Sequence, residues 1–348
     1  MRKNTKKIYV GNVPVGGGSP ITIQSMTNTL TKDIESTVSQ IKELEKLGCD
    51  ISRSAINDKE DAEAISKIKK RTSIPFIADI QFDYRLAIWA VENGADCLRI
   101  NPGNIGSKDK IKELVHCCNH YGTPIRIGVN SGSLHQSMIN KYHGVNAKSI
   151  CYSALEEIEY LESLSFNNIK VSLKSSDVNT SIESYTMFSN LSDYPLHLGI
   201  TEAGPSFKGA IKSAVGIGSL LSRGIGDTFR VSLTSDPTEE IIVAKEILKS
   251  LNLRREGINI ISCPTCARTK IDLISLVEQA EKILDQSDKH LNVAIMGCPV
   301  NGPGEAKEAD IGIACGKGVG LLFKKGEVIQ KVPEDKILEV LINEIEQM

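Results

Sequence analysis

Three cysteines near the C-terminus have the types and spacing of metal ligands. Cys263 and Cys266 form a C-P-T-C motif, and Cys298 lies in the segment G-C-P-V-N-G-P-G-E. Pro and Gly fix turns and let the backbone approach closely, so such segments suit a pocket that points N–H groups at inorganic sulfur. Iron–sulfur clusters are usually held by four ligands. These three thiols therefore predict a cluster site with one ligand still to be found.

Two residues are candidates for the fourth ligand. Cys315 would complete a closed four-thiolate site suited to carrying electrons, whereas Glu305 would give one iron a hard oxygen ligand that a substrate oxygen could displace. Zinc is the alternative metal, but no second paired C-x-x-C and no nearby His accompany the three cysteines. The pattern favours an iron–sulfur cluster and leaves both fourth ligands open.

A second group of chemically active residues consists of cations that belong to different apolar runs in the first two thirds of the chain. Guanidinium groups bind phosphate oxygens in pairs, so five cations gathered at one place predict a diphosphate site rather than a carboxylate site. Polar side chains accompany them in the same segments. The cations are Arg53, Arg99, Arg126, Lys174 and Arg230, and the polar residues are Asn101, Asn130 and Ser232.

Two acidic residues, Asp79 and Glu202, occupy equivalent positions at the ends of such runs. A carboxylate beside phosphates would be repelled unless it is protonated or faces another part of the substrate. Glu202 is therefore a candidate general acid or base. The alternative for any one of these charged residues is an ion pair that only closes the fold.

The runs that must position these cations alternate with helical patterns. One helix is predicted over 33–48, with Asp33 as a cap and Gly48 as a stop. Eight strand–helix repeats favour a (β/α)₈ barrel over a doubly wound open sheet, and barrels place their active sites at the carboxyl ends of the strands. A glycine run at 16–18 is expected to turn a hairpin that closes the barrel bottom. The predicted strands cover 21–26, 49–53, 75–79, 97–101, 125–130, 169–174, 196–202 and 228–232.

The pattern changes after the eighth repeat. A short strand at 258–261, a helix at 270–284, strands ending at 296 and starting at 311, a hairpin at 320–330 and a final helix from 334 predict a small α+β unit. The predicted fold class is thus α/β, an N-terminal (β/α)₈ TIM barrel followed by a small α+β iron–sulfur cluster domain. The predicted domains are 1–252, which binds the diphosphate, and 253–348, which holds the cluster.

Composition narrows the class of protein. The 348 residues carry a net charge of −2, which gives no reason to expect a nucleic-acid or membrane partner. No apolar run approaches the roughly 20 residues of a membrane span, and the basic N-terminus is not followed by an apolar segment. Nine cysteines in a long chain without a signal peptide indicate free thiols rather than disulfides. A cytoplasmic location is expected.

Motifs along nearly the whole chain resemble the (E)-4-hydroxy-3-methylbut-2-enyl diphosphate synthase family of the methylerythritol phosphate pathway, in its two-domain bacterial form. They occur in the order that the family has them, and the combination is highly specific. The matching stretches are Q-S-M-T-N-T from Gln24, A-D-I-Q-F-D-Y-R-L-A from Ala78, L-R-I-N-P-G-N from Leu98, R-I-G-V-N from Arg126, L-K-S-S-D-V from Leu173, H-L-G-I-T-E-A-G from His197, R-V-S-L-T-S-D-P from Arg230, and the two cysteine motifs.

The resemblance implies a function and assigns residues to it. The family reductively opens 2-C-methyl-D-erythritol 2,4-cyclodiphosphate with two electrons from flavodoxin or ferredoxin and releases water. It works as a head-to-tail homodimer in which the barrel of one subunit meets the cluster domain of another. By this resemblance, Glu202 lies beside the substrate's ring carbons with Asp79 and Asn301 nearby. The implied ligands of a [4Fe–4S] cluster are Cys263, Cys266, Cys298 and Glu305, and the implied diphosphate-binding residues are Arg53, Arg99, Arg126, Asn130, Lys174, Arg230 and Ser232.

The chain departs from the family pattern at three places. Gln81 stands where His is frequent, which questions a proton-transfer role there. Ser52 and Ser54 flank Arg53 where apolar residues are usual, which questions the placement of Arg53. Cys315 stands where Gly is common and is expected to be a spare thiol.

Two functions from other classes compete with this interpretation. One is a non-redox barrel lyase in which Lys174 forms a Schiff base and the cysteines hold structural zinc. The other is a non-catalytic cluster or zinc protein that delivers metal or scaffolds a partner, which would not explain five cations at one barrel mouth.

Overall fold

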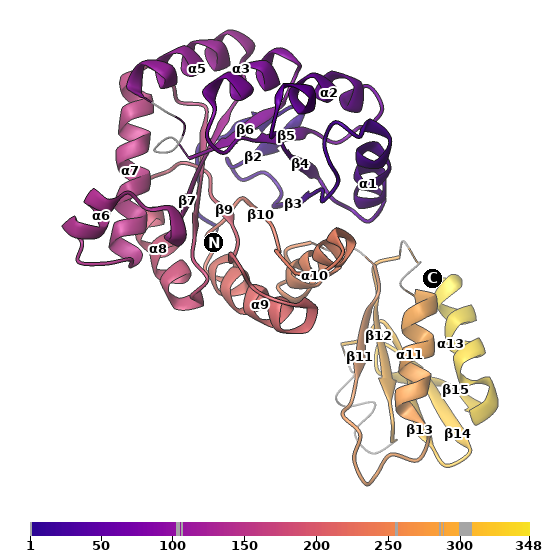
Figure 1. Ribbon diagram of the computed structural model, residues 1–348. Coiled ribbons are helices and arrows are strands. Elements are labelled where there is room, and N and C mark those ends of the chain that lie inside the picture. The colour runs from indigo at the N-terminus through magenta and orange to yellow at the C-terminus, as the bar shows by residue number, and fades with distance from the viewer. Residues whose placement is uncertain are drawn as a thin grey trace. The chain divides into compact units, whose positions relative to one another are not determined.

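The computed structural model describes residues 2–101, 105, 107–254, 257–284, 287, 289–298 and 308–348. The chain divides into two compact units, Met1–Leu253 and Arg254–Met348, and each is described by itself. Figure 1 shows the first unit as a ring of helices around a barrel of strands, and the second as a sheet with two helices on one face.

The first unit is a parallel eight-stranded barrel, as predicted. The strands pair in the order β8-β7-β6-β5-β4-β3-β10-β9, and a parallel bridge between Val171 and Leu196 joins β8 to β9 and nearly closes the ring. β7 and β8 span the predicted residues, whereas β9 and β10 are reduced to two residues each. The barrel strands are β3 (Thr22–Met26), β4 (Ile51–Ala55), β5 (Phe76–Asp79), β6 (Cys97–Ile100), β7 (Ile125–Asn130), β8 (Ile169–Lys174), β9 (His197–Leu198) and β10 (Thr228–Phe229).

Helices follow the strands and pack on the outside of the barrel (Figure 1). Side chains satisfy the free N–H groups at several of their starts. Asp33 accepts a hydrogen bond from the backbone N–H of Ser36 at 3.2 Å and thereby starts α1 at the predicted place. The helices are α1 (Ile34–Lys46), α2 (Lys59–Lys69), α3 (Tyr84–Glu92), α5 (Lys108–Tyr121), α6 (Gln136–Lys141), α7 (Ala147–Ser163), α8 (Val178–Leu191), α9 (Ser206–Ser222) and α10 (Pro237–Ser250), with a 3₁₀ turn at Ser131–Ser133.

An antiparallel hairpin, β1 (Ile8–Val10) and β2 (Val13–Val15), closes the bottom of the barrel. Its apolar residues pack against residues at the start of three strands, Ile51, Ile77 and Cys97. The expectation that the glycine run forms the turn was wrong. The two strands are joined at residues 11–12, and the glycines follow β2 with positive φ angles that only Gly adopts easily.

The second unit is a five-stranded sheet in the order β11-β12-β13-β14-β15. The first three strands are parallel and the last two are added antiparallel. Apolar residues of both helices cover the face that carries Ile311, Ile313 and Cys315. The elements are β11 (Asn259–Ser262), α11 (Leu273–Leu284), β12 (Asn292–Met296), β13 (Ile311–Gly316), β14 (Val319–Lys324), β15 (Glu327–Pro333), a 3₁₀ turn at Glu334–Lys336 and α13 (Ile337–Glu346). Among the described residues, no helix is long and apolar enough to cross a membrane.

Candidate active site

The predicted cations gather inside the mouth of the barrel. Alternate residues of a strand face the interior, and the register pairs Arg99 with Arg126 and Asn130 with Lys174 across neighbouring strands. Arg53, Arg126 and Lys174 are only 8%, 1% and 7% exposed. Burying charges in this way is costly unless something pairs with them, so the partners of each cation decide what the site can bind. We refer to Arg53, Arg99, Arg126, Lys174 and Arg230 as the cation ring.

Asp79 pairs with two members of the cation ring. Its carboxylate lies 3.6 Å from Nε of Arg53 and accepts a hydrogen bond from Nη1 of Arg99 at 3.2 Å. Burial alone would raise the pKa of Asp79, but the charges of Arg53 and Arg99 outweigh it and lower the pKa. Asp79 is therefore an ionised carboxylate that orients two guanidinium groups, and it has no proton to donate near neutral pH.

Arg230 has its own acidic partner, which the sequence analysis missed. Nε and Nη2 of Arg230 donate to the two carboxylate oxygens of Glu240 at 2.9 and 2.8 Å. Glu240 lies in the first turn of α10 and also accepts from the hydroxyl of Ser25. Acidic residues are common in the first turn of a helix, where they interact favourably with the helix dipole. The sequence position of Glu240 therefore did not mark it as a site residue.

Arg126 and Lys174 have no acidic partner among the described residues. Arg126 makes only a long contact, 3.5 Å, from Nη1 to the amide oxygen of Gln24. Burial and the nearby charge of Arg99 lower the pKa of Arg126 to about 10, and burial and Arg126 hold the pKa of Lys174 well below its usual range. Two buried cations without counter-ions are what an anionic ligand would complete.

Two glycines make room for the cation ring, and the sequence analysis did not single them out. A Cβ atom at Gly128 would lie 2.6 Å from Nε of Arg99, and one at Gly199 would lie 2.6 Å from Nζ of Lys174. Both distances are too short for a side chain. The close approach of the cations therefore requires Gly at these positions.

The remaining predicted barrel residues lie at the mouth with fewer contacts. The side-chain amide of Asn130 is oriented so that its nitrogen donates to the carbonyl of Val129 and its oxygen accepts from Nη2 of Arg99, both at 3.2 Å. Glu202 is exposed in a turn after β9 with a φ of 53°, which is a strained conformation for Glu. Ser232 is half-buried after β10. Within the described residues, neither Glu202 nor Ser232 has a hydrogen bond or ion pair to the cation ring.

The serines beside Arg53 do not disturb its placement. Ser52 donates its hydroxyl hydrogen bond to the carbonyl of Pro75 at 2.9 Å, and Ser54 shares one with Thr27 at 2.8 Å. Both are fully buried, while Arg53 reaches Asp79 inside the barrel. Gln81, the third departure on the barrel, is exposed in the turn between β5 and α3.

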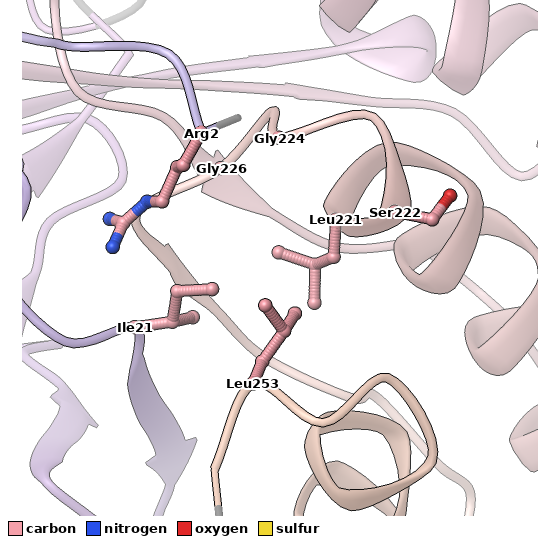
Figure 2. Close-up of a pocket in the computed structure, with 7 residues that line it drawn as sticks. All are labelled: Arg2, Ile21, Leu221, Ser222, Gly224, Gly226 and Leu253. Carbon is pink, nitrogen blue, oxygen red and sulfur yellow. The ribbon is translucent and has the colours of Figure 1, made fainter.

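A pocket of about 250 Å³ lies at the opposite end of the barrel, beside the residues that precede β3 and β10 (Figure 2). The side chains of Leu221 and Leu253 point toward one another there, and the guanidinium of Arg2 points away from them. That guanidinium is already held by Asp227 at 2.7 Å and by the carbonyl of Ser19. The pocket is apolar and its one cation is neutralised, so it is not the anion site.

In the second unit, the cysteines come to the carboxyl ends of parallel strands. Cys263 follows β11 and Cys298 follows β12 by two residues. The backbone N–H of Gly297 points at Sγ of Cys263 at 3.2 Å, and hydrogen bonds from Arg268 lower the pKa of Cys266. Donors aimed at sulfur favour thiolates, the form that binds iron. The donor set therefore fits an iron–sulfur cluster.

Among the described residues, no three side chains of His, Cys, Asp or Glu lie close enough together to hold a metal ion. Glu305 and Asn301 lie outside the described residues. Cys315 is fully buried near the end of β13, on the face covered by the helices, and burial raises the pKa of its thiol to about 12. This position suits a protonated spare thiol better than a ligand.

A parallel barrel with buried cations in its interior, joined to a cysteine-bearing α+β unit, defines a two-domain TIM-barrel protein. Residues 5–245 match the family model described as the GcpE TIM-barrel domain, and residues 259–347 match the GcpE protein C-terminal domain. The chain belongs to the GcpE family.

Curated relatives match over the full length. The 4-hydroxy-3-methylbut-2-en-1-yl diphosphate synthase (flavodoxin) of Clostridium tetani is 57% identical over 100% of this chain and 99% of its own, and that of Geobacter sulfurreducens is 53% identical over the same shares. Among solved structures, the N-acetylneuraminic acid synthetase of Leptospira borgpetersenii matches 82% of this chain and 100% of its own with a TM-score of 0.52, and the Yersinia pestis dihydropteroate synthase matches 71% and 99%, also at 0.52. At 11% and 10% identity these structures show the fold alone.

Proposed function

We propose that this chain is a 4-hydroxy-3-methylbut-2-en-1-yl diphosphate synthase that opens 2-C-methyl-D-erythritol 2,4-cyclodiphosphate reductively. The observation that carries the proposal is the 53–57% identity to synthases of that name over essentially the whole of both chains. The match includes both the barrel, proposed here for anion binding, and the cysteine-bearing unit, proposed for electron delivery.

The cation ring is proposed to bind the cyclic diphosphate. Arg126 and Lys174, which lack acidic partners, would meet the phosphate oxygens directly, while Asp79 and Glu240 fix the orientations of the other three arginines. Guanidinium forks fixed in this way recognise phosphate by geometry as well as by charge. Asn130 and Ser232 are proposed to add hydrogen bonds at the rim.

The second unit is proposed to hold a [4Fe–4S] cluster through Cys263, Cys266, Cys298 and Glu305. When bound, such a cluster supplies the two electrons of the reaction one at a time. The chain's part is to aim donors at the ligand sulfurs: the N–H of Gly297 points at Cys263, and hydrogen bonds from Arg268 lower the pKa of Cys266. Asn301, near Glu305 in the sequence, is proposed to lie close to the substrate.

Glu202 is proposed to transfer the proton that accompanies loss of the substrate hydroxyl as water. Its carboxylate is exposed at the mouth and forms no ion pair among the described residues, so it is available for proton transfer in a way that Asp79 is not. Glu202→Gln should lower kcat by about 10²–10⁴-fold, the usual contribution of general acid–base catalysis. Anaerobic steady-state assays, with iron content and substrate Kd as controls, check this. A kcat within threefold of the parent would remove Glu202 from the mechanism.

The proposed electron donor is flavodoxin or ferredoxin, and the name of the relatives specifies flavodoxin.

The protein is further proposed to form a head-to-tail homodimer and to reside in the cytoplasm. Exposed apolar side chains on α9 and α10, Phe207, Ile211 and Ile242, surround a groove of the kind that subunits bury. All nine cysteines are free thiols, which suits a reducing compartment.

The test is anaerobic purification followed by iron, sulfide and zinc analysis and an assay with the cyclic diphosphate and a chemical reductant. We expect a brown protein with about four irons per chain and formation of the linear diphosphate. A colourless protein with one zinc, trapped on Lys174 by borohydride in the presence of substrate, would support the lyase alternative instead.

A further inference from the structure

A sixth buried cation, Lys170, lies beside Arg126 in the interior of the barrel. It is an inward-facing residue of β8, fully buried, and its Cα pairs in register with that of Arg126. Below it the hairpin β1–β2 closes the barrel with apolar residues. Lys170 is thus enclosed between an apolar floor and a cluster of positive charges, and the proposed mechanism gives it no role.

Within the described residues, the amine of Lys170 has no hydrogen bond to an oxygen or nitrogen atom, and the thiol of Cys97 is the neighbour that favours its ammonium form. The titratable groups that face it are Cys97 on β6, Arg126 on β7, Arg53 on β4 and His197 on β9. None of these is a carboxylate, and His197 also has an unpartnered ring nitrogen, Nε2. Among the described residues, no carboxylate therefore pairs with a charge on Lys170 while the site is empty.

We propose that Lys170 is a positioning residue of the diphosphate site, whose buried amine gains a counter-charge only when a diphosphate occupies the cation ring. The proposal rests on the proposed binding of the cyclic diphosphate by that ring. The bound phosphates bring the negative charge that the barrel interior lacks, and they favour the ammonium form of Lys170. The ammonium then acts through Arg126, because its repulsion from the neighbouring strand favours the position of that guanidinium toward the phosphates.

The electrostatics of the empty barrel agree with this role. Burial lowers the pKa of Lys170 to about 8. At pH 8.5 most of the empty protein therefore carries a neutral amine at this position, whereas at pH 6.5 nearly all of it carries an ammonium. Proton uptake on binding should be large at the first pH and absent at the second.

The experiment measures proton uptake by anaerobic isothermal titration calorimetry of the cyclic diphosphate into the oxidised holoenzyme without reductant. Titrations at one pH in two buffers with different enthalpies of ionisation give the number of protons taken up. On binding at pH 8.5, K170M should take up nearly one proton fewer than the parent. At pH 6.5 the two proteins should take up the same number. At pH 6.5 its Kd should rise on the order of 10-fold, since one charge near the phosphates is lost. K141M, which removes an exposed lysine paired with Glu156, should match the parent in both respects.

Folding of the variant is checked by its melting temperature, which itself tests the proposal. A lysine with a lowered pKa destabilises the folded state below that pKa, because the unfolded chain keeps the proton more easily. K170M should therefore melt above the parent at pH 7, and the difference should shrink as the pH rises from 8 toward 10.

Two results would overturn the inference. In the first, K170M takes up as many protons as the parent when it binds the cyclic diphosphate at pH 8.5. In the second, the difference in proton uptake between K170M and the parent is the same at pH 8.5 and at pH 6.5. If the cation ring does not bind the cyclic diphosphate at all, a different result follows: R126M would bind the cyclic diphosphate as tightly as the parent. K170Q, which keeps a polar group of similar length, serves as the second variant and should lose the same proton.

Discussion

Cys298→Ala is expected to abolish cluster binding and turnover, whereas Cys315→Ala is expected to leave both intact. The two thiols are a matched pair, because both are buried in the second unit, at or just after the ends of neighbouring parallel strands. Cys298 follows its strand in the motif proposed to bind iron. Cys315 lies within its strand, on the face that the helices cover, with its pKa raised by burial. The same chemical deletion should therefore have opposite effects on iron content.

The measurement is iron and sulfide per chain and the visible spectrum after anaerobic purification, with turnover as a second readout. Loss of a ligand should lower activity by more than the 10–100-fold typical for removal of a ligand's hydrogen-bond partner. If Cys315→Ala loses iron as Cys298→Ala does, Cys315 is the fourth ligand and Glu305 is not. Far-ultraviolet circular dichroism shows whether each apoprotein keeps its sheet.

The barrel could be predicted from sequence because its strands are separate apolar runs with helical patterns between them. β7 and β8 begin and end as predicted, and Asp33 caps α1. β9 is shorter than its apolar run: the strand ends at Leu198, and at the next residue, Gly199, Lys174 fills the space beside the backbone. The sequence pattern reports which residues are apolar, but not at which residue the backbone stops pairing with the neighbouring strand.

The cations inside the barrel were also predictable, since each belongs to a different apolar run, but their partners were not. Asp79 contacts Arg53 and Arg99 across two strand pairs, and Glu240 reaches Arg230 from an outer helix. These pairings depend on the register and the closure of the barrel, which no local pattern reports. The same holds for Gly128: a side chain there would collide with Arg99, which belongs to another strand.

The pairings divide the cation ring into two sets with different tasks. Arg53 and Arg99 share the carboxylate of Asp79 and Arg230 has that of Glu240, so each has an acidic partner before any ligand arrives, although burial still holds the pKa of Arg53 well below its usual range. Arg126 and Lys174 carry none among the described residues, so the empty protein is destabilised by them. A site that is costly when empty binds its anion tightly, because the ligand supplies the missing counter-charge.

Arg126→Met is therefore expected to weaken binding and to stabilise the empty protein at the same time. Arg126 is 1% exposed, and Met fills a similar volume without a charge. The Kd for the cyclic diphosphate should rise by about 100-fold or more, the range for truncating one member of a buried charge pair. The melting temperature of the ligand-free protein should rise, since the lowered pKa of Arg126 marks its charge as unfavourable in the fold below pH 10.

Calorimetric titration and thermal melts of the same preparation measure both effects, with R71M as the control because Arg71 is an exposed arginine paired with Glu35. R71M should bind the cyclic diphosphate like the parent. The opposite signs of the two effects of Arg126→Met separate a binding role from a structural one. A residue that only holds the barrel together would lower the melting temperature along with the affinity, and that outcome would contradict the proposed anion site at Arg126. Higher stability with lost affinity would show that this charge is retained for the ligand.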